Sequence, residues 1–313
     1  MAQTASPPPA AEEAQPPVAP PPPGDAAGTG VLRAGGAIGF VTPAMVLIGV
    51  FLVFPAVWTL YLGLTDYRLT GLAAAAPQFA GADNYTAALE DPSFYNALRV
   101  TLVFVLGSAI LGQAVLGFAV AWMFRDWRGP WRTAIELLVI LAWIIPSSVV
   151  AFLWVAFLDG RSGTLNALLG IDTEWLLDFP LLSIIVFNIW RGTAFSMLLF
   201  GAALNSLPPS HLETARLAGA TGWQQLRDIV LPSVRGYALT NLLLISLWTF
   251  NDFTPFLLTG GGPSGATETL PIYIYREALS LFEFGYGSAI SAIMLVINLV
   301  LALFYLRLMR RTA

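Results

Sequence analysis

The sequence predicts an all-α protein that crosses a membrane about six times. Of its 313 residues, 57% are hydrophobic and only 11% are charged, and its mean hydropathy is +0.71. A soluble globular domain carries about 25% charged residues. Because an unpaired charge in hydrocarbon is costly, a charge content this low is typical of an integral membrane protein.

Long apolar stretches provide the second observation. The hydrocarbon core of a bilayer is about 30 Å thick and requires about 20 helical residues. Six stretches are long enough, at about 38–62, 98–124, 134–158, 181–204, 237–259 and 285–308. A membrane β-barrel would instead show short segments of alternating hydrophobicity.

The first 32 residues differ from the rest of the chain. They are rich in proline and alanine, and bury too little apolar surface to offset the entropy cost of ordering. We therefore predict a disordered cytoplasmic tail over residues 1–32, followed by a transmembrane domain over 33–313.

Arginine predicts the orientation of the chain. With the N-terminus inside, ten arginines fall on the cytoplasmic side, and four fall outside: Arg68, Arg99, Arg161 and Arg276. This ratio fits the positive-inside rule. We expect a multi-pass protein of a bacterial inner membrane with both termini in the cytoplasm.

Three residue types are absent or nearly absent, and this limits the metal sites and reactions that the chain can support. There is no cysteine, His211 is the only histidine, and all 15 cationic side chains are arginines. Clusters of thiolate or histidine metal ligands are excluded, so we predict no metal site. The phosphate-binding loop of ATPases requires a lysine, so this chain cannot hydrolyse ATP by that route. We predict no catalytic residue.

The longest cytoplasmic connection, residues 205–236, predicts two short helices. Ser210 with Glu213 and Thr221 with Gln224 both match the capping-box spacing. The first helix is expected to stop near Gly219, and the second is expected to end at Leu231–Pro232.

This loop resembles the EAA loop of permease subunits of binding-protein-dependent ABC importers. The matching positions are Glu213, Thr214, Ala215, Gly219, Ile229, Leu231 and Pro232. The resemblance implies a coupling helix that docks on a cytoplasmic ATPase subunit, within the type I importer fold. Thr214 replaces an alanine of that pattern, and Ala218 stands where many sugar permeases have aspartate. The alternative is an ordinary structured surface loop; we favour coupling.

Outer segments narrow the resemblance to carbohydrate-uptake permeases of the maltose and glycerol-phosphate type, particularly the larger maltose subunit. The segment Phe79–Tyr85 is similar to their first outer loop, and Leu258–Pro263 is similar to their outer turn, with Gly260, Gly261, Gly262 and Pro263. The resemblance implies a second homologous permease, two ATPase subunits that hold ATP and magnesium, an extracytoplasmic sugar-binding protein, and no cofactor in this chain.

Polar residues within the spans are candidates for a substrate path. Arg191 lies near the middle of the fourth span, after Asn188 and Trp190. A charge at this depth faces a cavity or a partner by default. Arg191 is either a donor to sugar hydroxyls or a structural arginine bonded to Asp252 or to carbonyls.

The fifth predicted span adds Trp248, Asn251 and Asp252, which with Pro255 would share one helix face. Carboxylate and amide groups bind sugar hydroxyls, and rings stack on apolar sugar faces. Contact with other helices is the alternative. Gln113, Trp143 and Asn298 are weaker candidates.

We therefore interpret the chain as one permease subunit that forms half of a translocation path for a sugar, such as an oligosaccharide, disaccharide or related glycoside. Glycerol phosphate or another solute is the alternative cargo. A self-sufficient secondary carrier is a further alternative. It would show inverted repeats and buried acids, but the sequence shows no inverted repeat, and only Asp252 and Glu136 lie in or at the spans. A membrane enzyme would need paired acid–base groups, which no common span provides.

Overall fold

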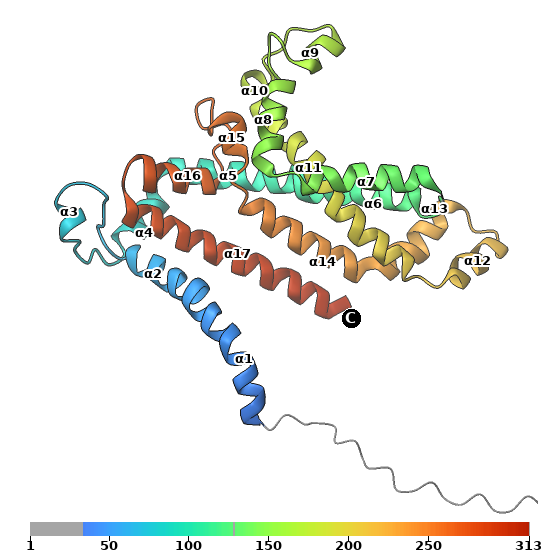
Figure 1. Ribbon diagram of the computed structural model, residues 1–313, viewed down its shortest axis with the longest axis horizontal. Helices are drawn as coiled ribbons and strands as arrows, with labels where there is room; N and C mark the ends of the chain where they lie inside the picture. Colours follow the sequence, from blue (N-terminus) through green and yellow to red (C-terminus); the bar gives the residue numbers. More distant parts are fainter. Residues whose placement is uncertain (1–33, 128, 313) are drawn as a thin grey trace, which may run out of the picture. The chain divides into compact units, whose positions relative to one another are not determined.

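The computed structural model describes residues 34–127 and 129–312, and nearly all of their regular structure is helical (Figure 1). Within these residues the strand-type pairing consists of one bridge between Thr65 and Phe79. The all-α prediction is thus confirmed. The predicted tail, residues 1–32, lies outside the described part of the chain.

The chain divides into two units, Met1–Pro55 and Ala56–Ala313. The described part of the first unit contains α1 (Ala34–Ile48), the π-helical turn η1 (Gly49–Val53) and the first residues of α2 (Phe54–Leu62). Residues Val41–Leu62 form a helix long and apolar enough to cross a membrane. This confirms the first predicted span.

The described residues of the second unit form eighteen helical elements in addition to the remainder of α2. They are α3 (Leu72–Ala75), α4 (Asp83–Glu90), α5 (Pro92–Phe104), η2 (Val105–Gln113), α6 (Ala114–Phe124), α7 (Pro130–Ile144), α8 (Ser147–Phe157), α9 (Thr164–Leu169), α10 (Trp175–Asp178), α11 (Pro180–Asn205), α12 (Pro209–Leu217), α13 (Gly222–Gln225), η3 (Leu226–Val230), α14 (Leu231–Phe250), α15 (Pro255–Thr259), α16 (Leu270–Tyr275), η4 (Arg276–Ser280) and α17 (Phe284–Thr312).

Two π-helical segments join helices into longer ones. Through η2, residues Pro92–Phe124 form one helix of 33 residues, and through η3, residues Gly222–Phe250 form one of 29 residues. With Pro180–Asn205 and Phe284–Arg311, these account for four more candidate spans.

The third and fifth spans differ from the sequence-based expectation. The stretch predicted at 134–158 is not a single straight helix, because α7 and α8 meet at a bend of 102°. The cause is Pro146, which keeps the preceding Ile145 extended at ψ 134°. The fifth span ends at Phe250 instead of residue 259, and its helix begins at Gly222. The described residues thus hold five long spans and one broken pair.

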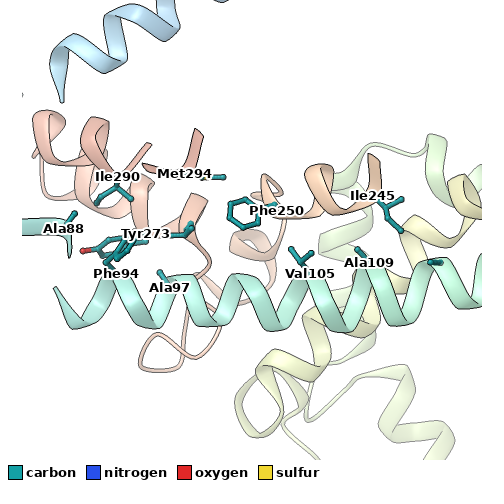
Figure 2. Packing of buried hydrophobic residues seen from close by; sticks show 12 residues of the cluster. Ala88, Phe94, Ala97, Val105, Ala109, Ile245, Phe250, Tyr273, Ile290 and Met294 are labelled. Carbon is teal, nitrogen blue, oxygen red and sulfur yellow. The ribbon is translucent and has the colours of Figure 1, made fainter. Parts of the chain in front are cut away.

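The packing of the second unit places α11 against α6, η2 and α14, while α17 lies against α14 and α4. Figure 2 shows one buried cluster whose side chains come from helices far apart in the sequence, among them Phe94, Phe250, Tyr273 and Ile290. Helices α4 and α16 lie at one end of this unit and α12 and α13 at the other (Figure 1). We call these the α16 end and the α12 end.

Candidate functional site

The loop at the α12 end folds into two short helices, as the sequence predicts. Helix α12 begins after Pro208 and shows no side-chain cap, so the predicted Ser210–Glu213 capping box is wrong. Pro209 is the first helical residue, a position that favours proline because its missing N–H would have no partner within the helix.

Helix α12 ends at Leu217, and Gly219, two residues further on, has a φ of +81°. The amide of Ala220 donates to the carbonyl of Ala215 at 2.9 Å, and the amide of Gly219 donates to Arg216 at 3.0 Å. These two bonds form a Schellman motif, which requires a left-handed residue and therefore favours glycine here.

The second helix starts with the predicted capping box. The hydroxyl oxygen of Thr221 accepts from the amide of Gln224 at 3.3 Å, and Gln224 Oε1 accepts from the amide of Thr221 at 2.7 Å. Leu231–Pro232 does not end this helix, contrary to the prediction. The chain stays helical through the π-helical η3 into α14, with Pro232 in the first turn of α14.

The predicted coupling residues lie on or beside an exposed surface. Glu213, Thr214, Gly219, Leu231 and Pro232 are exposed, whereas Ala215 and Ile229 are half-buried. Two large apolar side chains extend furthest into solvent: Leu217 is 91% exposed and Trp223 is 67% exposed.

The underside of the same loop is anchored. Val230 is fully buried, and Leu212 and Leu226 pack against its cluster. The loop is therefore held in one conformation while it presents apolar side chains outward. An exposed apolar surface on an ordered loop is typical of a protein contact.

The second candidate site is a cavity of about 340 Å³ between η2, α7, α11 and the end of α14. Its lining residues are Gln113, Trp143, Asn188, Arg191, Gly192, Phe195, Ile245, Leu247, Trp248, Thr249, Asn251 and Asp252. Five of the six predicted path residues thus meet at one cavity. Trp190 does not line it and instead contacts Trp154, with ring centroids 5.8 Å apart.

An ion pair lies at the wall of this cavity. Arg191 Nη1 is 3.5 Å from Asp252 Oδ2 and donates to the hydroxyl of Thr254 at 2.9 Å. Asp252 in turn accepts from the hydroxyl of Thr254 at 2.6 Å and from its amide at 2.9 Å. Arg191 therefore has the structural partner that the sequence offered as one alternative, and it also faces the cavity.

A buried amide network forms part of the cavity wall. Gln113 Nε2 donates to the carbonyl of Asn188 at 3.0 Å, and Asn188 Nδ2 donates to the hydroxyl of Ser108 at 2.7 Å. A Cβ at Gly192 would lie 2.2 Å from Gln113 Oε1, so glycine is required for this contact. Because buried polar groups need partners, the network holds Asn188 in place.

Aromatic rings also line the cavity. Phe195 packs edge-on against Trp248 at 4.6 Å between centroids and lies 5.9 Å from Trp143. Sequence reasoning missed Phe195 and Gly192. Their spacing of 4 and 7 residues from Asn188, which places all three on one helix face, is the signal that would have identified them.

The residues after Trp248 do not continue the helix that the sequence predicted, although Asn251 and Asp252 still line the cavity. Asn251 follows the last residue of α14, and Pro255 starts the separate helix α15. The expectation of one continuous helix face through Pro255 is therefore wrong. Asn251 exchanges amide hydrogen bonds with Asn298 of α17 at 3.1 and 3.3 Å.

The predicted outer turn and the residues after it are held by side chains from outside the turn. Gly260 and Gly261 have positive φ, and the Gly262–Pro263 peptide bond is cis. The hydroxyl of Thr267 donates to the carbonyl of Gly262 at 2.9 Å, and Asn96 Nδ2 donates to the carbonyl of Gly265 at 3.0 Å. The turn is thereby connected to α5.

The α16 end contains a network of hydroxyl and charged groups. Asp91 accepts from the hydroxyl of Tyr273 and, at 3.1 Å, from that of Tyr286. Burial raises the pKa of Asp91, but bonds from Tyr273, the Ser93 amide and Tyr286 outweigh it and hold the pKa below the ordinary 3.8. Burial and the bond to Asp91 raise the pKa of the Tyr273 hydroxyl.

Arg276 bridges two buried acids of the same end. It lies 2.5 Å from Glu268 and 3.0 Å from Glu277. No group of three His, Cys, Asp or Glu side chains suited to a metal ion occurs among the described residues.

Comparisons with known proteins agree with this geometry. The family model described as binding-protein-dependent transport system inner membrane component matches residues 113–313. A probable ABC transporter permease of Pyrococcus horikoshii is 32% identical over 280 residues, covering 85% of this chain and 93% of the relative. The sulfoquinovosyl glycerol permease SmoG of Agrobacterium fabrum is 28% identical, covering 88% of this chain and 90% of SmoG.

A solved structure shares the fold. A chain of a bacterial ABC transporter involved in the import of the acidic polysaccharide alginate superposes with a TM-score of 0.75 at 24% identity. The match covers 88% of this chain and 95% of that chain. The chain therefore belongs to the family of inner membrane components of binding-protein-dependent transport systems, and is an ABC importer permease.

Proposed function

We propose that this permease forms half of the translocation path for a sugar, and that the Arg191–Asp252–Trp248 cavity contacts it. The observation that carries the proposal is the composition of that cavity. The lining combines amide, carboxylate and guanidinium groups with the rings of Trp248, Phe195 and Trp143. Sugars offer hydroxyls to the first and apolar C–H faces to the second.

The ion pair favours a neutral cargo. Arg191 lies beside Asp252, so the two charges compensate each other within the cavity. Glycerol phosphate, the alternative cargo, would need a cation that is not already neutralised. The name of SmoG, a sulfoquinovosyl glycerol permease, supports a cargo that contains a sugar.

The exposed loop supports a mechanism driven by a partner. Leu217 and Trp223 would dock on an ATPase subunit, which would hold ATP and magnesium and carry out hydrolysis. A second permease would complete the path, and an extracytoplasmic binding protein would deliver the sugar. The loop and both termini would then face the cytoplasm, in agreement with the arginine distribution.

Purification from native membranes tests this assembly. The tagged chain should copurify with a second permease, an ATPase and an exported binding protein, each identified by mass spectrometry. Thermal-shift screening of that binding protein against sugars and sugar phosphates then names the cargo. A chain that transports in liposomes without ATP or partners would refute the proposal.

The cavity is tested by Trp248→Ala in the reconstituted importer. Loss of the stacking ring should reduce ATP-driven uptake three- to tenfold, because an aromatic contact contributes about 0.5–1.5 kcal/mol. Trp131→Ala is the matched control, since Trp131 is 79% exposed and does not line the cavity. Equal losses in both variants would contradict a role for the cavity.

A further inference from the structure

Two buried polar residues lie one helical turn beyond the cavity, toward the α12 end. On α11, Ser196 follows the cavity residue Gly192 by four positions. On α14, which leads away from the α12 end, Asn241 precedes the cavity residue Ile245 by four positions. Four helical residues rise about 6 Å and return to the same face. Ser196 and Asn241, which we call the polar layer, therefore lie at a similar depth.

Two apolar clusters locate the polar layer independently. On α11, Phe195 packs against the cluster of Figure 2, whereas Met197 belongs to a second cluster nearer the α12 end. On α14, Ile245 belongs to the first cluster and Val234 to the second. The polar layer thus lies between the two clusters on both helices.

The polar layer is inside the helix bundle. Ser196 and Asn241 are both 0% exposed. Helix α6 packs closely at the same depth, because a Cβ at Gly117 would lie 2.3 Å from the Cβ of Ser196. Neither residue of the layer therefore faces lipid.

The polar atoms of this layer have no hydrogen-bond partner within the described part of the chain. This holds for both side-chain atoms of Asn241 and for the hydroxyl of Ser196. The cavity wall differs, because Gln113 donates to Asn188 and Asn188 donates to Ser108. An unpaired buried amide costs free energy, whereas a leucine of similar size would not. Asn241 is therefore unfavourable in this conformation, so its benefit must come from another one.

We propose that Asn241 and Ser196 form a second binding layer of the translocation path, which exchanges hydrogen bonds with water and sugar hydroxyls when the path opens toward the α12 end. An amide and a hydroxyl both donate and accept, so they suit a cargo rich in hydroxyls. Polar side chains within spanning helices mark substrate pathways. The two apolar clusters would close the path on either side of the layer in the conformation described here. The proposal rests on the sugar path proposed above.

Cysteine accessibility tests the opening, because the chain contains no cysteine of its own. Asn241→Cys and Ser196→Cys are labelled in the assembled importer with a charged, water-soluble methanethiosulfonate, without nucleotide and after trapping with ATP and vanadate. The labelling rate of each should differ between the two states by about tenfold or more, because only an accessible thiolate reacts. Equal rates in the two states would overturn the proposal.

Ser246→Cys is the matched control for labelling. Ser246 is also 0% exposed on α14, but its hydroxyl lies 3.2 Å from that of Tyr305 and is hydrogen-bonded to it. Its labelling should stay slow in both states. A Ser246→Cys thiol that follows the same pattern as Asn241→Cys would indicate general loosening of α14 and overturn a defined layer.

Asn241→Leu tests the contact with the cargo. It should leave the unfolding temperature unchanged or raise it, while ATP-driven uptake falls about fivefold, as expected for a lost hydrogen bond. Ser246→Ala should do the opposite, because it removes a partnered group: a lower unfolding temperature with unchanged uptake per folded importer. A lower unfolding temperature for Asn241→Leu would show that the amide is bonded in this conformation, and undiminished uptake would show that it does not contact the cargo. Either result would overturn the proposal.

Failure of this proposal can be distinguished from failure of the sugar path. If Trp248→Ala reduces uptake and Asn241→Leu does not, the cavity stands and the polar layer is refuted. State-dependent labelling requires no knowledge of the cargo. A binding protein that recognises no sugar would therefore refute the sugar proposal while the labelling result still shows that the layer opens.

Discussion

The two ends of the second unit differ in which side chains they bury and which they expose. At the α16 end, Asp91, Tyr273 and Tyr286 bond to one another, and Arg276 bridges Glu268 and Glu277. At the α12 end, large apolar side chains face outward, and Leu217 has the highest exposure among them.

The difference shows which end depends on other subunits. Buried carboxylates require partners because an uncompensated buried charge is strongly destabilising, and the α16 end supplies those partners from its own helices. Exposed leucine and tryptophan gain free energy only when another surface covers them. The α16 end is therefore stabilised within this chain, whereas the α12 end is suited to stabilise an assembly.

The largest expected effect is at the α12 end. Leu217→Asp should reduce both copurification of the ATPase and ATP-driven uptake by about thirtyfold, as expected for an interface hot spot of about 2 kcal/mol. Thermal unfolding of the isolated chain should shift little, since surface substitutions change stability by about 0.5 kcal/mol or less.

Leu168→Asp in α9 is the matched control, because Leu168 is also highly exposed, at 75%. It should leave copurification of the ATPase unchanged. A Leu217 variant that unfolds at a much lower temperature would contradict the comparison, because it would show that the loop stabilises its own chain.

At the α16 end, removal of the Arg276 side-chain charge should lower the stability of the folded chain. Arg276→Gln leaves Glu268 and Glu277 buried without their cation. Breaking a fully buried ion pair costs about 3–5 kcal/mol. Because Arg276 is 40% exposed, we expect a smaller decrease in the free energy of unfolding, of about 2 kcal/mol. The measurement is denaturant unfolding in detergent, and Arg68→Gln serves as control. Arg68 pairs with Glu283 at 2.9 Å on an exposed surface, so its loss should cost less than about 1 kcal/mol.

A smaller loss is expected from Asp91→Asn. The amide oxygen still accepts a hydrogen bond, but the charge-assisted bonds from Tyr273 and Tyr286 weaken, at a cost of about 1 kcal/mol. Thermal unfolding checks this, with the exposed Glu90→Gln as control. If Asp91→Asn unfolds like the wild type, the hydroxyl network does not stabilise this end.

The smallest effect concerns pH. Because the pKa of Asp91 in the folded chain is below 3.8, its contribution is complete above that pH and is lost as the pH falls through the folded-state pKa. The stability advantage of the wild type over Asp91→Asn should therefore be constant from pH 7 to 5 and shrink below pH 4. An advantage that grows on acidification would contradict the direction of this shift.

Several features followed from local sequence alone. Apolar length predicted the long spans, and Gly219 predicted the end of α12, because these depend on burial in lipid and on local backbone geometry. The Thr221–Gln224 capping box was predicted for the same reason, whereas Pro208 and Pro209 replaced the predicted cap at Ser210.

The contacts among the polar residues of the candidate path were determined by the tertiary structure. The sequence by itself determined the membrane class, the exposed loop and most of the candidate path residues. It did not determine that α14 stops at Phe250, that α7 and α8 bend by 102°, or that Arg191 contacts Asp252 across 61 positions. The bend has a local cause in Pro146, but the Arg191–Asp252 contact depends on packing between helices remote in sequence, which a local pattern does not specify.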